Sequence, residues 1–205
     1  MMGNTISRTQ IFNLTLITGL AFMVGGVINY PLSYLAYGEA SAFMTILSIV
    51  LRYLVQAIIG CFALAWQLRQ QYPFKKLWLM GVSSIILGIL IPAILMNQFF
   101  YALLVFPGLL IGLAFGMFLW EIQAVWIMIA TCSISMLIAN IYYMGTGASL
   151  QSFNVWFIDK FGQYWTSNML IEAIPNFLLG AGIALGVGLV LRKREKDGGS
   201  FHRNS

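Results

Sequence analysis

The fold is decided by residues 77–120, LWLMGVSSIILGILIPAILMNQFFYALLVFPGLLIGLAFGMFLW, which contain no charged side chain. This stretch divides into two apolar runs, 77–96 and 101–120, on either side of the polar pair Asn97 and Gln98. A run of about 20 apolar residues is the length of helix that crosses the roughly 30 Å hydrocarbon core of a bilayer. The stretch therefore predicts two antiparallel transmembrane helices joined by a short turn.

The composition extends this prediction to the whole chain. Of its 205 residues, 60% are hydrophobic and 8% are charged, whereas an ordinary soluble domain is about 25% charged. Such a chain has too few polar groups to cover a surface that faces water. We therefore predict an all-α, polytopic membrane helix bundle.

Six apolar runs are long enough to be spans, and together they form a single bundle domain over 1–191. A polar, basic tail follows over 192–205. The predicted spans are 11–29, 43–66, 77–96, 101–120, 124–144 and 170–191.

Lysine and arginine predict the orientation, because short loops rich in these residues stay in the cytoplasm. If the N-terminus is cytoplasmic, only Lys160 falls on the outer side. The residues on the cytoplasmic side are then Arg8, Arg69, Lys75, Lys76, Arg192, Lys193, Arg194, Lys196 and Arg203. We therefore predict both termini inside, in the cell (inner or plasma) membrane. The net charge of +5 reflects this bias and not nucleic-acid binding, and the tail is suited to anionic lipid headgroups.

The reactive side chains give no sign of a cofactor, metal or catalytic site. The single histidine, His202, lies in the polar tail, and Cys61 and Cys132 stand alone in apolar runs. No spacing resembles a zinc, haem or redox motif, and no phosphate-binding loop is present. The candidate acid or base groups are Glu121, Glu172 and Asp159, and none of them has a nucleophile or metal partner in the pattern. We predict that the chain is not an enzyme, and an intramembrane enzyme ranks third among the interpretations of its function.

Small residues recur at every fourth position in several spans, which lets helices approach closely in lipid. The faces are Ala21 and Gly25 in the first span, Gly108, Gly112 and Gly116 in the fourth, and Gly180, Ala184 and Gly188 in the sixth. Two interpretations stay open: packing between helices of this chain, or docking of another membrane subunit.

Charge inside the predicted spans marks a candidate ligand site. Ser48, Arg52 and Gln56 share one face of the second span, and Glu172 and Asn176 share one face of the sixth. A cation at that depth costs at least about 2.5 kcal/mol unless it is paired or hydrated. We expect Arg52 to pair with Glu172, either as a structural clip between helices or as part of a site for a small-molecule ligand.

Aromatic residues precede the last span. Phe153, Phe157, Phe161 and Trp165 repeat every four residues. This spacing predicts an amphipathic helix over 151–165 that lies in the outer interface, where aromatic rings favour headgroup depth. Its role is that of an anchor or of a lid over the polar site.

Two of these segments carry a family resemblance. A Pro-Gly-x-x-x-Gly-x-x-x-Gly helix from Pro107 to Gly116, and a last helix that opens with residues 168–172, Asn-Met-Leu-Ile-Glu, and ends in basic residues, resemble the substrate-binding S components of energy-coupling factor transporters. The resemblance implies capture of a micronutrient outside the cell and docking on a membrane coupling subunit with two ATPases. The alternative is a non-catalytic accessory or assembly subunit of a larger membrane complex.

Overall fold

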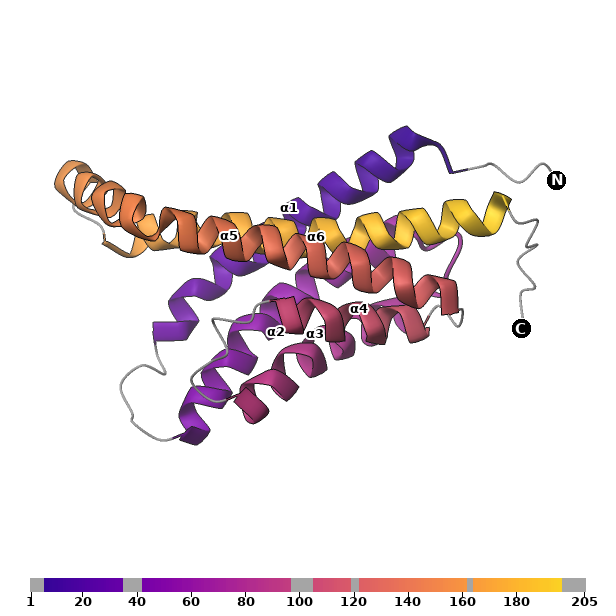
Figure 1. Cartoon of the computed structure of the whole chain (residues 1–205), viewed down its shortest axis with the longest axis horizontal. Coiled ribbons are helices and arrows are strands. Elements are labelled where there is room, and N and C mark those ends of the chain that lie inside the picture. Colours follow the sequence, from indigo (N-terminus) through magenta and orange to yellow (C-terminus); the bar gives the residue numbers. More distant parts are fainter. Residues whose placement is uncertain (1–5, 35–41, 97–104, 119–121, 162–163, 197–205) are drawn as a thin grey trace.

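The computed structural model describes residues 6–34, 42–96, 105–118, 122–161 and 164–196. Every regular element among them is a helix. The helices are α1 (Arg8–Tyr34), α2 (Ala42–Gln67), α3 (Phe74–Met96), α4 (Val105–Phe118), α5 (Ile122–Phe161) and α6 (Tyr164–Lys196). One helix lies on each predicted span, which confirms the all-α prediction (Figure 1).

Four segments of these helices are long and apolar enough to cross a membrane. They are Arg8–Ile28, Phe74–Ile91, Ile122–Tyr142 and Ala173–Lys196. Two shorter apolar segments, Tyr53–Gln67 and Phe106–Phe118, lie in α2 and α4. The chain thus has the helices of a membrane protein. The shorter segments overlap the predicted spans 43–66 and 101–120.

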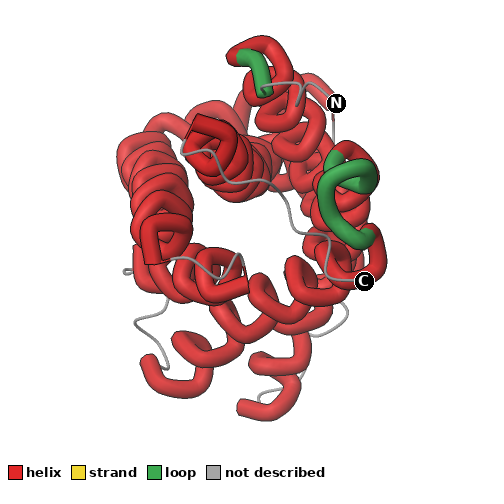
Figure 2. The backbone as a smooth tube through the Cα atoms, turned by 90° about the vertical axis from the view of Figure 1, so that its right-hand side faces the viewer, coloured by secondary structure: helices red, strands yellow, loops and turns green. Residues whose placement is uncertain are grey.

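The six helices close into a ring. Each helix packs on its neighbours in the chain, and α6 packs on α1. Seen nearly end-on, the helices surround the centre of the bundle (Figure 2). Buried apolar side chains hold the ring together, and the largest of them include Phe22, Phe115, Met128 and Ile183.

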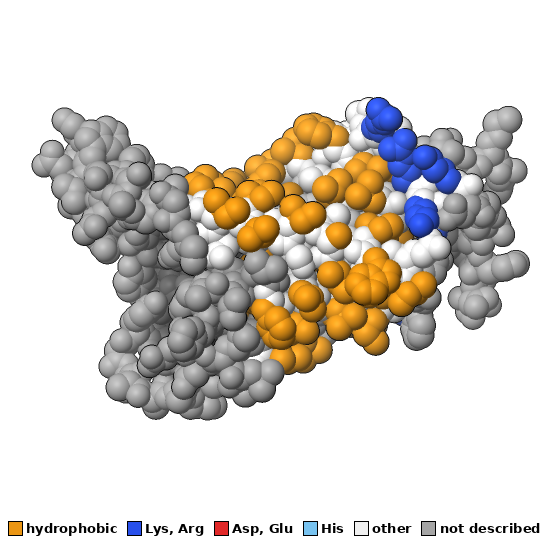
Figure 3. Space-filling model, viewed as in Figure 1, with side chains coloured by type: hydrophobic (Ala, Val, Ile, Leu, Met, Phe, Trp, Pro, Cys, Tyr) orange, Lys and Arg blue, Asp and Glu red, His pale blue; other side chains and the backbone are white. Residues whose placement is uncertain are grey.

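The outer surface of the ring is apolar. Large hydrophobic side chains such as Phe12, Met117 and Trp126 are more than half exposed, and apolar atoms cover much of the middle of the face in Figure 3. A soluble monomer rarely exposes such extensive apolar surface. This surface is suited to contact with lipid chains.

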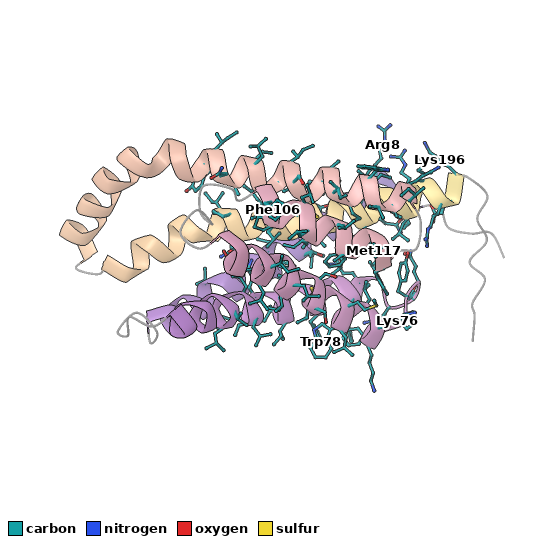
Figure 4. The ribbon with its side chains drawn as sticks, turned by 60° about the horizontal axis from the view of Figure 1, so that its bottom comes forward. Arg8, Lys76, Trp78, Phe106, Met117 and Lys196 are labelled. Carbon is teal, nitrogen blue, oxygen red and sulfur yellow. The ribbon has the colours of Figure 1, made fainter. Side chains whose placement is uncertain are left out.

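Basic side chains gather at one end of the bundle, as Figure 3 shows for one face. Arg8, Lys76 and Lys196, from three different helices, lie toward this end (Figure 4). The Ile6 backbone N–H donates a 2.5 Å hydrogen bond to Glu195 Oε2. Arg194 Nη1 donates to the hydroxyl of Tyr72 at 3.4 Å, which joins the end of α6 to the turn between α2 and α3.

The prediction of a separate interfacial helix over 151–165 is wrong. α5 continues without interruption to Phe161, and α6 begins at Tyr164. No proline lies between Ile122 and Phe161, and an interior glycine costs a helix only about 1 kcal/mol, so nothing in the sequence ends the helix near residue 144. At 1.5 Å per residue, the 40 residues of α5 extend about 60 Å. The α5–α6 hairpin accordingly reaches past the ends of the other helices (Figure 1).

The beginning of the predicted tail is also helical. α6 continues through residues 192–196 and has Lys193, Arg194 and Lys196 in its last turn. Basic side chains at a helix C-terminus interact favourably with the helix dipole. The helix therefore ends five residues later than the predicted span.

Candidate functional site

The candidate site lies where α1 contacts α2 on one side and α6 on the other. Two consecutive glycines of α1 make these contacts. A Cβ added to Gly25 would meet Gln56 Cα of α2 at 2.8 Å, and a Cβ added to Gly26 would overlap the Asn176 side chain of α6. Only glycine leaves room for both neighbours at this level of α1. The structure therefore brings Gln56 and Asn176, from two predicted polar stripes, to adjacent residues of one helix.

Gln56 is the unusual residue of this group. Its side chain is 1% exposed, and its amide Nε2 has no hydrogen-bond partner among the described residues. A buried donor without a partner costs about 1–3 kcal/mol, and such groups in native structures are normally satisfied by protein atoms, water or a ligand. Gln56 is therefore a donor that a bound molecule can satisfy.

The other predicted site residues are placed only by their backbone. The side chains of Ser48, Arg52 and Glu172 lie outside the described part of the structure. Their helix positions show that Arg52 is one turn from Gln56 along α2, and that Glu172 is one turn before Asn176 on α6. α1 packs against both α2 and α6. The ion pair stays a prediction.

A second polar layer, absent from the sequence-based site, lies nearer the basic end. Gln67 Nε2 of α2 donates a 3.2 Å hydrogen bond to Thr18 Oγ1 of α1, and Thr18 is fully buried. The hydroxyl of Thr15, one turn earlier on α1, is buried without a hydrogen-bond partner in the described residues. The signal in the sequence is the spacing of the two threonines, three residues apart in an apolar run.

Phe22 separates the two polar layers. Its side chain is 0% exposed, and its ring contacts the backbone positions of Gly60 in α2 and Gly180 in α6, where an added Cβ would overlap it. Gly180 belongs to a predicted small-residue face, whereas Gly60 was not predicted. The two glycines therefore allow one aromatic ring to pack closely against the backbones of α2 and α6.

The glycine face of α4 packs within the chain. A Cβ added to Gly108 would meet the Cys132 carbonyl oxygen at 2.7 Å, and one added to Gly112 would meet Ile129 Cα at 2.6 Å. A Cβ added to Gly116 would overlap the backbone of Val125. All three neighbours belong to α5, so this face is occupied by another helix of the same chain.

α6 uses glycine on two of its faces. Gly180 and Gly188 contact α1, at Phe22 and Ile11, whereas Gly182 and Gly186 contact Ser135 and Thr131 of α5. The second face was not predicted, although its glycines also lie four residues apart. Of the remaining predicted small residues, Ala184 is fully buried and Ala21 is half-buried.

The structure also places the cysteines. Cys61 and Cys132 are free and buried, on α2 and α5. Among the residues that the structure describes, no three histidine, cysteine, aspartate or glutamate side chains lie together as a metal site would require. Glu121 and His202 lie outside the described residues.

Comparison of the chain with protein-family models, with curated proteins and with solved structures finds no match.

Proposed function

We propose that this chain is a six-span cell-membrane protein that captures a small polar solute, as the substrate-binding component of a micronutrient uptake transporter. The solute enters from the side opposite the basic end. Its site lies between α1, α2 and α6, at the level of Gln56 and Asn176.

The observation that carries this proposal is the buried amide of Gln56, whose Nε2 has no hydrogen-bond partner among the described residues. Gln56 lies 11 residues before the end of α2 at Gln67, which is about 16 Å at 1.5 Å per residue. This depth is close to the middle of a bilayer with a hydrocarbon core of about 30 Å. A polar group maintained there at a cost in stability is typical of a binding site in a membrane protein.

The chemistry of the site favours binding over catalysis. Gln56 and Asn176 both carry neutral amides, which donate and accept hydrogen bonds but do not titrate. They are suited to a solute that carries carbonyl or carboxylate oxygens and N–H groups. Arg52, one turn farther from the basic end, would add a cation for an anionic group.

The basic end supports the orientation. Arg8, Lys76 and Lys196 lie toward one end of the bundle, and positively charged loops remain on the cytoplasmic side. Both termini are then cytoplasmic, and the α5–α6 hairpin projects outside. The glycine faces of α4 and α6 are occupied within the chain, so docking on a coupling subunit would use other surfaces.

The test is ligand-dependent thermal stability of the purified chain against a panel of vitamin-like solutes. A solute at about 100 times its Kd should stabilise the protein by about 2.7 kcal/mol. Gln56→Leu should abolish this stabilisation. Without ligand, the variant should be at least as stable as the wild type, because it removes a buried donor that has no partner in the described part of the chain.

The matched control is Ser84→Ala, which changes a buried polar side chain on α3. This variant should keep the response to the solute. A wild-type protein that no solute stabilises, and that co-purifies with a stoichiometric membrane partner, would contradict capture and favour the accessory-subunit alternative.

A further inference from the structure

One face of α1 connects the two polar layers of the bundle. Thr15, Thr18, Phe22 and Gly25 follow one another at spacings of three or four residues, so they lie on one side of the helix. Three contacts show that this side faces α2. Thr18 meets Gln67, Phe22 meets Gly60, and Gly25 meets Gln56.

Each polar layer holds a buried group whose hydrogen bonding is incomplete. Thr15 Oγ1 lies in the layer nearer the basic end and Gln56 Nε2 in the farther layer, and neither has a hydrogen-bond partner among the described residues. Internal water typically satisfies such groups, provided that several polar atoms surround it. Thr15, Thr18 and Gln67 supply such a set in one layer, and Gln56 and Asn176 in the other.

The apolar barrier between these layers is thin. From Thr18 to Gly25 the helix rises about 10 Å, and Phe22 occupies the middle of that distance. Gly60 of α2 and Gly180 of α6 carry no side chain, and the ring of Phe22 packs against both of them. One turn nearer the basic end, the Phe177 ring of α6 packs against Gly19 of α1. Narrow apolar constrictions of this kind close a pore by excluding water.

We propose that Phe22 is the gate between the outer solute site and an inner polar layer formed by Thr15, Thr18 and Gln67. The chain then holds both ends of a path through itself and translocates as well as captures. The identity of the outer layer as a solute site rests on the proposed function. The proposal that Phe22 closes a hydratable path between the two layers is independent of the proposed function.

Proton flux into proteoliposomes that contain the full chain tests the gate without any solute. The vesicles hold a pH-sensitive dye, and a potassium gradient with valinomycin drives protons inward. The wild type should be sealed. Phe22→Ala removes the ring and should raise the flux by about tenfold or more, because water can then join the two layers.

Phe115→Ala is the matched control. Phe115 is an equally buried ring on α4, and it packs near Gly81 of α3. Its truncation leaves a similar cavity away from the α1–α2 face, so its flux should stay near that of the wild type. Equal fluxes in the two variants would overturn the gate.

Two leucine variants, Phe22→Leu and Phe115→Leu, make the result independent of whether Phe22→Ala folds in good yield. Phe22→Leu keeps most of the apolar volume and should leak less than Phe22→Ala but more than Phe115→Leu. Equal fluxes in the two leucine variants would overturn the gate even if Phe22→Ala cannot be purified.

Adding Thr18→Val to Phe22→Ala should lower the flux, because it removes part of the inner polar layer.

The outcomes separate the two proposals. A sealed, folded Phe22→Ala protein that still gains stability from a solute would overturn the gate alone. A leaking Phe22→Ala protein whose parent no solute stabilises would support the gate and contradict solute capture.

Discussion

Gln67 on α2 donates a 3.2 Å hydrogen bond to the hydroxyl of Thr18 on α1, in a position where Thr18 is inaccessible to solvent. The same amide nitrogen lies 3.3 Å from the Ala63 carbonyl of its own helix. One amide therefore joins two antiparallel helices, one turn of α1 nearer the basic end than Phe22.

This bond should contribute measurably to stability. Thr18→Val and Gln67→Leu should each lower the free energy of unfolding by about 1 kcal/mol. The double variant should show a coupling of about 0.6 kcal/mol, the usual size for hydrogen bonds between helices in membranes. Unfolding in mixed micelles measures all three.

Thr131→Val is the control for this cycle, because the Thr131 hydroxyl bonds to carbonyls of its own helix. It should not couple to Gln67→Leu. Strict additivity of the Thr18 and Gln67 variants would mean that the bond contributes nothing.

The glycine contacts of α4 should be intolerant of a methyl group. In Gly112→Ala the new Cβ would meet Ile129 Cα and the Met128 carbonyl oxygen, both at 2.6 Å. These are backbone atoms, so α4 and α5 must move apart, and we expect a loss of about 1–3 kcal/mol.

Gly188→Ala is the comparison for Gly112→Ala, because its nearest neighbour is the Ile11 side-chain methyl Cγ2 at 3.0 Å, which can move. Alanine also favours the helix by about 1 kcal/mol, so this variant should be close to neutral. Similar losses at both positions, measured in the same unfolding assay, would argue against backbone contact as the cause.

The proposed orientation predicts which residues can be labelled from outside. Tags at residue 1 and residue 205 should report the cytoplasm, and Gly147→Cys should react with a membrane-impermeant maleimide added to intact cells. Gly147 lies 25 residues beyond the start of α5 at Ile122, which is about 37 Å along the helix and more than the hydrocarbon thickness of about 30 Å.

The native cysteines provide a low background for this labelling, because Cys61 and Cys132 are both buried. The unmodified chain should therefore remain unlabelled. Reaction of a terminal tag with an external reagent would reverse the proposed orientation or change the number of spans.

The predicted pair of Arg52 and Glu172 should appear as non-additivity. If the pair forms, Glu172→Gln leaves the Arg52 cation within the membrane without compensation and should cost several kcal/mol. Arg52→Gln should be milder in the Glu172→Gln background than alone, because the double change leaves no uncompensated charge. Unfolding of the single and double variants completes the cycle.

Arg69 supplies the comparison for this cycle, since it stacks over Trp66 at 3.9 Å at the other end of α2. Arg69→Gln and Glu172→Gln should be additive within about 0.5 kcal/mol, as distant residues are. Additivity within the same limit between Arg52→Gln and Glu172→Gln would show that these two residues do not interact. Coupling together with lost solute binding in a folded variant would place the pair in the site.

The sequence by itself determined that helices lie on the six apolar runs, although it did not show that α5 continues to Phe161. A helix satisfies its backbone hydrogen bonds internally, so a long apolar run is enough to predict one in lipid. The runs that contain Leu77 and Leu110 could be recognised without knowing which helices they contact, and the cations marked one end of the bundle. Residue identity also placed Gln56 and Asn176 on polar stripes, because these side chains interrupt otherwise apolar segments.

Only the tertiary structure decided which helix each face meets. Lipid chains are as apolar as the helix surfaces, so hydrophobicity does not distinguish the outward from the inward side of a span. Rotation and neighbours follow instead from close packing, as Gly25 and Gly26 show by contacting two different helices. The contacts of Phe22 with Gly60 and Gly180, and the hydrogen bond from Gln67 to Thr18, join residues far apart in the chain. Packing alone brings these residues together.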